Sequence, residues 1–455
     1  MPHEFDVVIL GGGSGGYACA LRAAQLGRSV ALVERDRLGG TCLHRGCVPT
    51  KALLHAAELA DAARHGAAHG IRSTFDGVDM AGVNAFKDKV VGRLHNGLRG
   101  LVSGAGITVV EAEGRLTGPR TVTAGDRELV GRDVVLATGS YARTLPGVDL
   151  GPRVLTSDQA LAMTEVPKRA VVIGGSVIGV EFASVWRSFG AEVTVVEALP
   201  SLVPLEDASL STHLERAFRR RGIAFRTGAR VASVVDKGDQ AVVALEGGDE
   251  LPADVVLVAV GRGPATAGLG YEEQGVALDR GWVVVDDRLA TTVEGVHAVG
   301  DLVPGLQLAH RGFAHGVFVA EEIAGLQPEP VVDSSIPRVT YCEPELASVG
   351  LTEAQARETY GDVQVYEYDL AGNGRSQILD TAGFVKLVRE PAGPIVGVHM
   401  IGTRMGEQVG EAALMVGWEA LPEDVARFVH AHPTQNEALG EAALALAGRP
   451  LHAHG

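Results

Sequence analysis

The 455-residue sequence predicts an α/β protein in which two similar βαβ units precede a C-terminal α+β domain. Two observations support this prediction first: a glycine-rich turn at residues 11–16, and a similar glycine-rich turn at residues 174–179. Each turn lies between a buried strand and a helix. The third is a change of pattern from Pro337 onward, where short strands alternate with helices and no glycine fingerprint occurs. A chain of this length is expected to divide into several domains.

Composition narrows the class of protein. The formal charge of −16 makes nucleic acid and anionic membranes poor partners. No apolar run reaches the roughly 18 residues that a membrane helix needs. The N-terminus shows no basic segment followed by an apolar one, so we expect no secretory signal. Four cysteines are too few for a disulfide framework, and a reducing cytoplasm is the expected location.

The first unit combines a strand at residues 7–10, the glycines Gly11, Gly13 and Gly16, and a helix at residues 17–26. A second strand at residues 29–33 ends at Glu34. The glycines permit a tight turn and let a pyrophosphate approach the helix N-terminus, and the acid is placed to accept hydrogen bonds from a ribose. Together these features predict a Rossmann-like dinucleotide site.

The second unit repeats the design and ends its second strand, residues 193–196, at Glu197. Ser176 stands where the fingerprint has its second glycine, which weakens the motif without removing it. Two fingerprints predict two dinucleotides. The terminal carboxylate has no basic residue directly after it and would repel a 2′-phosphate, so it favours NAD over NADP.

Residues 39–51 read GGTCLHRGCVPTK and hold Cys42 and Cys47. On an ideal helix, residues five apart differ by about 140° in direction and about 7.5 Å in height, whereas a disulfide needs Cα atoms roughly 4.4–6.8 Å apart. The two can pair only where the backbone bends, and Gly46 and Pro49 favour a bend. On these residues alone, a redox-active dithiol and two ordinary buried thiols both stay open.

The cysteine motif, placed behind a dinucleotide unit, resembles that of the pyridine nucleotide-disulfide oxidoreductases, which carry GGTC-x4-C-x-P-x-K at this position. The resemblance covers about residues 4–453 and is closest to the branch that oxidises dihydrolipoamide. It implies FAD in the first unit, NAD in the second, and a redox disulfide in which Cys42 meets the substrate and Cys47 faces the flavin. It also implies that Lys51 lies beside the flavin.

Further short segments, located after strand ends or at a helix start, also match the family pattern. Each of these segments alone would be an ordinary turn or helix start. The resemblance, with the fingerprints, gives these expected FAD contacts: Gly11, Gly13, Ser14, Gly15, Gly16, Glu34, Thr41, Lys51, Gly114, Thr138, Gly139, Ser140, Asp301, Leu308, Ala309 and His310. The expected NAD contacts are Gly174, Ser176, Val177, Ile178, Gly179, Glu181, Glu197, Gly261 and Arg262. No metal ligand is expected.

The last motif is HAHPTQNE, residues 430–437. A histidine titrates near neutrality, and a carboxylate partner commonly fixes its orientation. In the family, HPT-x-x-E supplies an acid–base histidine and its orienting glutamate, so the resemblance gives these roles to His432 and Glu437. His430 is a rival that lacks the match. The resemblance further implies a homodimer in which His432 reaches the dithiol of the other subunit.

The expected domains are an FAD-binding domain in two parts (residues 1–150 and 271–335), an NAD-binding domain (151–270) and a C-terminal dimerisation domain (336–455). The implied reaction is the oxidation of dihydrolipoamide to lipoamide by NAD+, on the lipoyl domains of a 2-oxo acid dehydrogenase complex or of glycine cleavage. A glutathione-type disulfide reductase is the enzymatic alternative, and a flavin-binding structural or redox-sensor subunit without turnover is the alternative from another class. Separately, we hypothesise that Arg45, between the cysteines, favours a thiolate.

Overall fold

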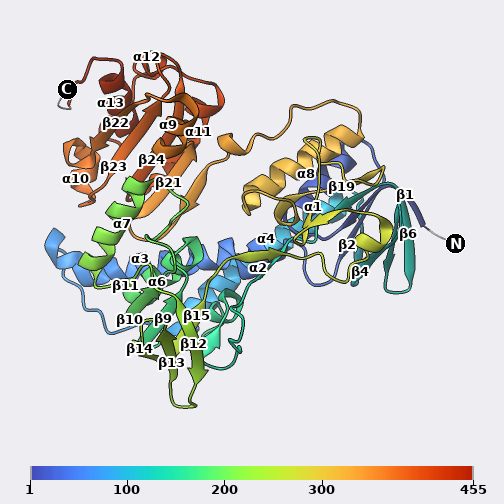
Figure 1. Ribbon diagram of the computed structural model, residues 1–455, viewed down its shortest axis with the longest axis horizontal. Helices are drawn as coiled ribbons and strands as arrows, with labels where there is room; N and C mark the ends of the chain where they lie inside the picture. Colours follow the sequence, from blue (N-terminus) through green and yellow to red (C-terminus); the bar gives the residue numbers. More distant parts are fainter. Residues whose placement is uncertain (1–2, 453–455) are drawn as a thin grey trace.

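The computed structural model describes residues 3–452, and Figure 1 shows a main sheet in each of three parts of that range. The first sheet has the strand order β3-β2-β1-β6-β5-β4, with β19 paired to β6. Its strands are β1 (His3–Leu10), β2 (Val30–Glu34), β3 (Thr108–Glu111), β4 (Gly114–Gly118), β5 (Thr121–Ala124), β6 (Arg127–Leu136) and β19 (Val296–Ala298).

The core of the first sheet is parallel. β1 pairs in parallel with β2 and β6, and its residues Val7, Val8 and Ile9 are fully buried. Such continuous apolar runs are typical of strands covered on both faces. α1 (Ser14–Gln25) packs against α8 (Ala309–Ile323), so a late segment of the chain returns to the first unit. The domain boundaries drawn from the sequence stay predictions.

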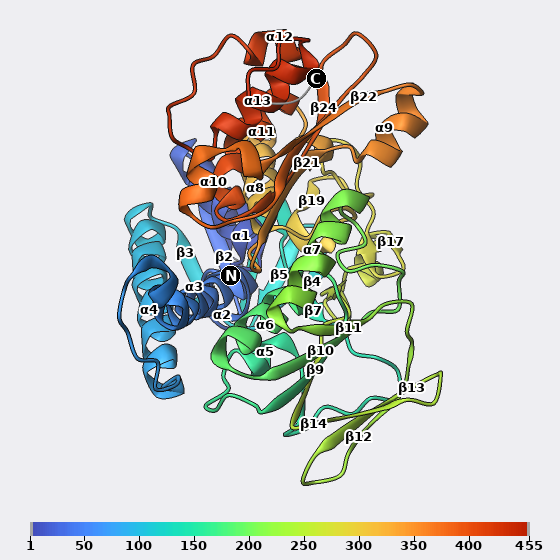
Figure 2. The same ribbon diagram turned by 90° about the vertical axis from the view of Figure 1, so that its left-hand side faces the viewer.

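The second sheet has the order β11-β10-β9-β15-β8, and its strands pair in parallel. They are β8 (Val154–Leu155), β9 (Arg169–Ile173), β10 (Glu192–Val196), β11 (Ala224–Arg226) and β15 (Val255–Val258); the helices are α5 (Ser157–Ala160), α6 (Val177–Phe189) and α7 (Ala208–Arg221). An antiparallel sheet of β12 (Val231–Asp236), β13 (Ala241–Leu245) and β14 (Glu250–Ala253) extends from it at the bottom of Figure 2.

The C-terminal sheet is antiparallel, with the order β20-β21-β24-β23-β22. Its strands are β20 (Arg338–Thr340), β21 (Glu345–Gly350), β22 (Gln364–Asp369), β23 (Phe384–Arg389) and β24 (Ile395–Gly402). The helices around it are α9 (Glu353–Tyr360), α10 (Gly374–Ile378), α11 (Met405–Gly417), α12 (Pro422–Val425) and α13 (Glu437–Leu446). The predicted fold class, two Rossmann-like domains and a C-terminal α+β domain, is confirmed.

The cysteine motif lies on α2 (Gly40–Arg45) and the start of α3 (Cys47–His65), and α3 packs on α4 (Met80–Gly104) and α6. The two helices are separated at Gly46 (φ −145°, ψ −116°), and α3 starts directly after it. Within residues 3–452, no helix is both long and apolar enough to span a bilayer.

Two parallel strands, one in each nucleotide unit, end shortly before a second, short strand begins. β6 ends at Leu136, and β15 ends at Val258. The residues beyond them form β7 (Ser140–Ala142) and β16 (Arg262–Pro264), which pair antiparallel and place Ser140 opposite Pro264. This small ladder joins the ends of the first and second units.

Candidate active site

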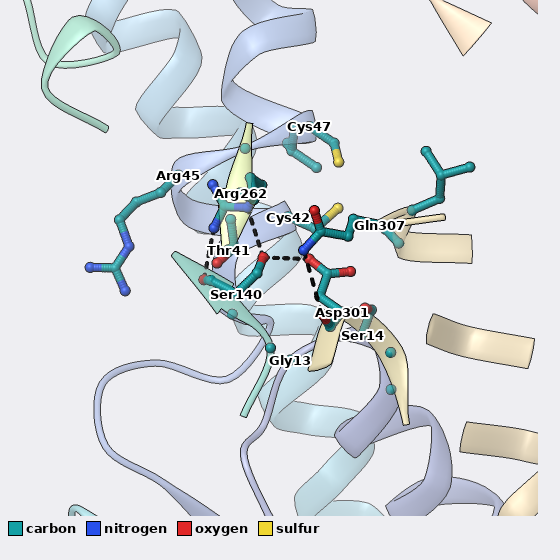
Figure 3. Close-up of a pocket in the computed structure, with 18 of the residues that line it drawn as sticks. Gly13, Ser14, Thr41, Cys42, Arg45, Cys47, Ser140, Arg262, Asp301 and Gln307 are labelled. Carbon is teal, nitrogen blue, oxygen red and sulfur yellow. Dashed lines mark hydrogen bonds between the residues drawn. The ribbon is translucent and has the colours of Figure 1, made fainter. Parts of the chain in front are cut away.

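A cavity of about 950 Å³ lies where the two units, the cysteine helices and the C-terminal domain meet. Its walls come from both glycine turns, from α2 and α3, and from Val339 and Tyr341. The predicted site residues that line it are Gly11, Gly13, Ser14, Gly15, Glu34, Thr41, Cys42, Cys47, Lys51, Gly114, Thr138, Gly139, Ser140, Ser176, Val177, Ile178, Glu181, Gly261, Arg262, Asp301, Leu308, Ala309 and His310. Figure 3 shows part of this wall.

Gly16 and Gly179 do not line the cavity, and the structure gives them a packing role. A Cβ atom on Gly16 would lie 1.8 Å from the carbonyl oxygen of Gly11, and one on Gly179 would lie 1.8 Å from that of Gly174. Gly11 and Gly174 themselves have φ values of +108° and +106°, which L-residues with side chains rarely adopt. The two turns therefore share one geometry, in which the last glycine lets the helix pack against the turn.

The glutamate at the end of the second strand of each unit accepts a hydrogen bond from the glycine turn of the same unit. Glu34 accepts a hydrogen bond from the amide of Gly12 at 2.7 Å, and Glu197 accepts one from the amide of Gly175 at 2.7 Å. Glu34 lines the cavity, whereas Glu197 is 7% exposed and also accepts from the amide of Leu199. Their ribose contacts stay predictions.

Ser176 occupies the same backbone conformation as its counterpart in the first turn. It is the N-cap of α6 with φ −86° and ψ −172°, and Gly13 is the N-cap of α1 with φ −73° and ψ −170°. This extended conformation is open to any residue. Serine therefore introduces no backbone strain in place of glycine.

Cys42 and Cys47 are free thiols that interact with each other. The pKa of Cys47 is lowered to about 7, because the hydrogen bond from Cys42 and the charge of Lys51 together outweigh the opposing effect of burial. The same hydrogen bond and burial raise the pKa of Cys42. Cys47 also begins α3, and a helix N-terminus favours a thiolate. The pair is therefore asymmetric, with Cys47 as the thiolate.

Lys51 supplies the positive charge beside this thiolate. Its Nζ atom lies 2.8 Å from each carboxylate oxygen of Glu181, and 4.7 Å from the ring centroid of Tyr341. The backbone amide of Tyr341 donates to the same carboxylate at 2.9 Å. Glu181 is 2% exposed, so it is a buried carboxylate and not a solvated helix acid. Tyr341 itself had no motif to mark it.

The hypothesis that Arg45 favours the thiolate is not supported. Its Nη2 atom lies 2.6 Å from the carboxylate of Asp36, and its side chain is 48% exposed. The adjacent His44 bonds the carbonyl oxygen of Leu38 instead of either cysteine. Because the charge of Arg45 is paired and solvated, Lys51 is the cation that acts on Cys47.

A chain of hydrogen bonds joins residues that the sequence assigned to different cofactors. Arg262 Nε donates to Ser140 Oγ at 2.7 Å, and Ser140 Oγ donates to Asp301 Oδ2 at 2.6 Å (Figure 3). Gln307, which no motif indicated, also lines the cavity and donates to the backbone carbonyl of Asp301 at 3.4 Å. Arg262 was expected at NAD, but its side chain is committed to the first unit through Ser140.

His432 and Glu437 form the predicted pair but do not line the cavity. Nδ1 of His432 lies 2.8 Å from Glu437 Oε1, and the amide of Thr434 donates to Glu437 Oε2 at 2.8 Å. Burial raises the pKa of Glu437, but these two hydrogen bonds outweigh it and the net pKa is lowered. The His432 side chain is 75% exposed on the C-terminal domain. The pair therefore faces outward and is open to a second molecule.

His430 has a different environment from His432. Its Nε2 atom lies 2.8 Å from Glu411 Oε1, and its side chain is only 12% exposed. The hydrogen bond that His430 donates to the Glu411 carboxylate raises the pKa of His430. This histidine joins α11 to the segment before α13, which is a structural role.

Two similar glycine turns and a reactive dithiol at one cavity define a redox protein that exchanges electrons between a nucleotide and a disulfide. The profile of the pyridine nucleotide-disulphide oxidoreductases matches residues 5–316, and the profile of their dimerisation domain matches residues 336–443. The chain belongs to this family. Its cofactors are FAD and NAD, and its dimerisation domain makes it a homodimer.

Relatives of known function cover almost the whole chain. It is 40% identical to a mitochondrial dihydrolipoyl dehydrogenase of Pisum sativum, over 99% of this chain and 93% of that protein. It is 38% identical to a dihydrolipoyl dehydrogenase of Bacillus subtilis, over 99% of this chain and 100% of that protein. The crystal structure of LpdA from Mycobacterium tuberculosis matches with a TM-score of 0.91 and 26% identity, over 98% of this chain and 99% of that one.

Proposed function

We propose that this protein is a dihydrolipoyl dehydrogenase, which oxidises dihydrolipoamide to lipoamide and passes the electron pair to NAD+. The observation that carries the proposal is the Cys42–Cys47 dithiol, placed with Lys51 on the wall of a cavity that is also lined by Gly11 of the first turn and Ser176 of the second. The names of the relatives that span the chain support the choice of substrate.

The chemistry of the dithiol follows from thiol–disulfide exchange. The oxidised Cys42–Cys47 disulfide meets one thiol of dihydrolipoamide, and His432 of a second subunit takes its proton, because only the thiolate attacks. Attack on Cys42 Sγ forms a mixed disulfide and releases Cys47 as the thiolate. The second substrate thiol then displaces Cys42 and its proton passes to the Cys42 sulfur, so lipoamide leaves as a disulfide and the enzyme holds both electrons as two reduced cysteines.

The roles of the two cysteines agree with their environments. The released Cys47 is stabilised by the charge of Lys51 and, once Cys42 is also reduced, by the hydrogen bond from Cys42. Cys42, with its raised pKa, keeps its proton in the reduced pair. Glu437 orients His432 and stabilises the charge that it gains with the substrate proton. In the reduced state, Cys47 is thus the thiolate from which the electron pair leaves.

The residues along the cavity fit the two cofactors. A cavity of about 950 Å³, glycines at the first turn and the carboxylate of Asp301 suit an elongated dinucleotide with a polyol chain. Bound at these residues, FAD would supply the redox chemistry that links the dithiol to NAD+. We assign FAD to the side with Ser14, Glu34, Lys51 and Asp301, and NAD to the α6 side with Ser176, Val177 and Glu181.

The partners follow from the substrate. We propose that the enzyme serves the lipoyl domains of a 2-oxo acid dehydrogenase complex or of glycine cleavage, and that it acts in the cytoplasm. The exposed position of His432 on the dimerisation domain supports an active site completed by the second subunit of the homodimer. Residues 336–455 would then act both in assembly and in catalysis.

Steady-state turnover tests this proposal against the glutathione-type reductase. We would compare dihydrolipoamide with NAD+ or NADP+ against oxidised glutathione with NADH or NADPH, on the yellow protein. Turnover of dihydrolipoamide with NAD+ is expected. Glutathione reduction with NADPH would overturn both the substrate and the nucleotide. Oxidation of NADH by artificial acceptors without any dithiol activity would favour a flavin-binding subunit of another role.

A further inference from the structure

One face of α6 carries a row of buried polar side chains. Glu181, Ser184 and Ser188 follow each other at spacings of three and four residues, which place them on the same side of a helix. Their exposed fractions are 2%, 2% and 3%. Buried polar groups need partners, and each of these three side chains finds its partners outside α6.

The first residue of this row, Glu181, and the last, Ser188, both bind residues of α3. Glu181 binds Lys51 near the start of α3. Ser188 Oγ donates to Asp61 Oδ2 at 2.5 Å, ten residues later on α3. Ten helical residues span about 15 Å. Two contacts this far apart restrict both the sliding and the tilting of α3 against α6.

Arg221, the last residue of α7, completes the upper contact. Its Nη2 atom donates to Ser188 Oγ at 2.7 Å and lies 3.1 Å from Asp61 Oδ2. Its Nη1 atom donates to Ser184 Oγ and, at 3.0 Å, to the carbonyl oxygen of Glu343. The side chain is 19% exposed. One guanidinium thus joins α3, α6, α7 and the C-terminal domain.

The segment at Glu343 returns to the redox centre. The amide of Glu343 donates to Ser184 Oγ at 3.0 Å, and two residues earlier the amide of Tyr341 donates to Glu181 at 2.9 Å. The ring of Tyr341 lies against Lys51 Nζ. Arg221 is therefore connected to the ammonium group of Lys51 in two ways, through α3 and through residues 341–343.

We infer that Arg221 is a positioning residue for the redox dithiol: by holding Asp61 and the carbonyl of Glu343, it keeps α3 in the register that places Lys51 between Glu181 and Cys47. This inference rests on the proposed role of Cys42 and Cys47. Its readout is the ionisation of Cys47, which needs no substrate. The experiment can therefore overturn this inference without affecting the proposed substrate, and an error in the proposed substrate would not change its result.

The test is the pH profile of iodoacetamide alkylation at Cys47 in the reduced, FAD-loaded protein, followed by mass spectrometry. Arg221→Gln should move the midpoint upward by about 0.5–1 pH unit, because Lys51 is no longer held at the thiolate. Arg219→Gln is the matched control, since Arg219 lies on the same helix, is 61% exposed and pairs with Glu215. It should leave the midpoint unchanged.

A double variant separates positioning from a general loss of stability. Lys51→Met alone removes the charge, so adding Arg221→Gln to it should produce no further shift. Shifts that add, or a wild-type midpoint in Arg221→Gln, would overturn the inference, whatever happens to the melting temperature. If Arg221→Gln fails to fold, Asp61→Asn and Arg221→Lys, which weaken the same contact, provide the same comparison.

Discussion

Lys51 Nζ contacts both carboxylate oxygens of Glu181 at 2.8 Å, so a residue of the redox helix is paired with a residue of the second nucleotide unit. The pair is shielded, with side-chain exposures of 31% and 3%. Burial would lower the pKa of Lys51, but the charge and hydrogen bond of Glu181 give a net increase. The ammonium group therefore stays charged where Cys47 ionises.

Loss of the Lys51 charge should weaken the thiolate. The hydrogen bond from Cys42 and the charge of Lys51 lower the pKa of Cys47 to about 7, so thiolate accumulates as the pH rises through about 7. In Lys51→Met the alkylation midpoint should move to higher pH, by about one unit. Lys89→Met, at an exposed position of α4, is the control. An identical profile in both variants would contradict the assignment of the charge.

His432 should act as the acid–base group, and His430 should not. His432→Gln should lower dihydrolipoamide turnover by about 10²–10⁴-fold, because proton transfer from the substrate thiol is lost. NADH oxidation by artificial acceptors should persist. His430→Gln removes a half-buried ion pair with Glu411, so it should lower the melting temperature more than the turnover per folded molecule. The reverse pattern would make His430 the base.

Glu437 should hold His432 in the orientation that turnover needs. Its carboxylate lies 2.8 Å from Nδ1 of His432. In Glu437→Gln the imidazole loses this charged partner, so kcat for dihydrolipoamide should decrease while NADH oxidation by artificial acceptors persists. An unchanged kcat would show that Glu437 does not orient the base.

The last glycine of the first turn should not accept a side chain. In Gly16→Ala the new Cβ atom would lie 1.8 Å from the Gly11 carbonyl oxygen, so the turn must open and FAD content should fall sharply. Gly92→Ala is a matched control in the middle of α4, where a Cβ atom meets nothing within 4 Å. That change should stabilise the fold by about 0.5–1 kcal/mol. Equal FAD content in the two variants would refute the packing role.

The glycine turns and the cysteine motif were predictable because local geometry determines them. A strand, a positive-φ glycine and a helix start all lie within a few residues, as at Gly11 and Gly174. The contacts that complete the site were not predictable, because they join distant segments. Arg262 reaches Ser140, and Glu181 reaches Lys51, only once the sheets have assembled.

The ion-pair partner of a charged side chain could not be predicted from the sequence either. Arg45 lies between the cysteines along the chain, yet Asp36 pairs with it and removes it from the thiolates. Gln307 and Tyr341 line the cavity from loops without a motif. Sequence spacing predicted the reacting groups, but only the fold shows which side chains surround them.

The most direct test of the account is complementation between two inactive subunits. Cys42→Ser and His432→Ala chains, tagged differently and purified as a heterodimer, should contain one complete site from the dithiol of one chain and His432 of the other. Dihydrolipoamide oxidation by NAD+ should return to about half of the wild-type rate, while each mutant homodimer stays inactive. A heterodimer as inactive as its parents would contradict a shared active site and the role of this dithiol in it.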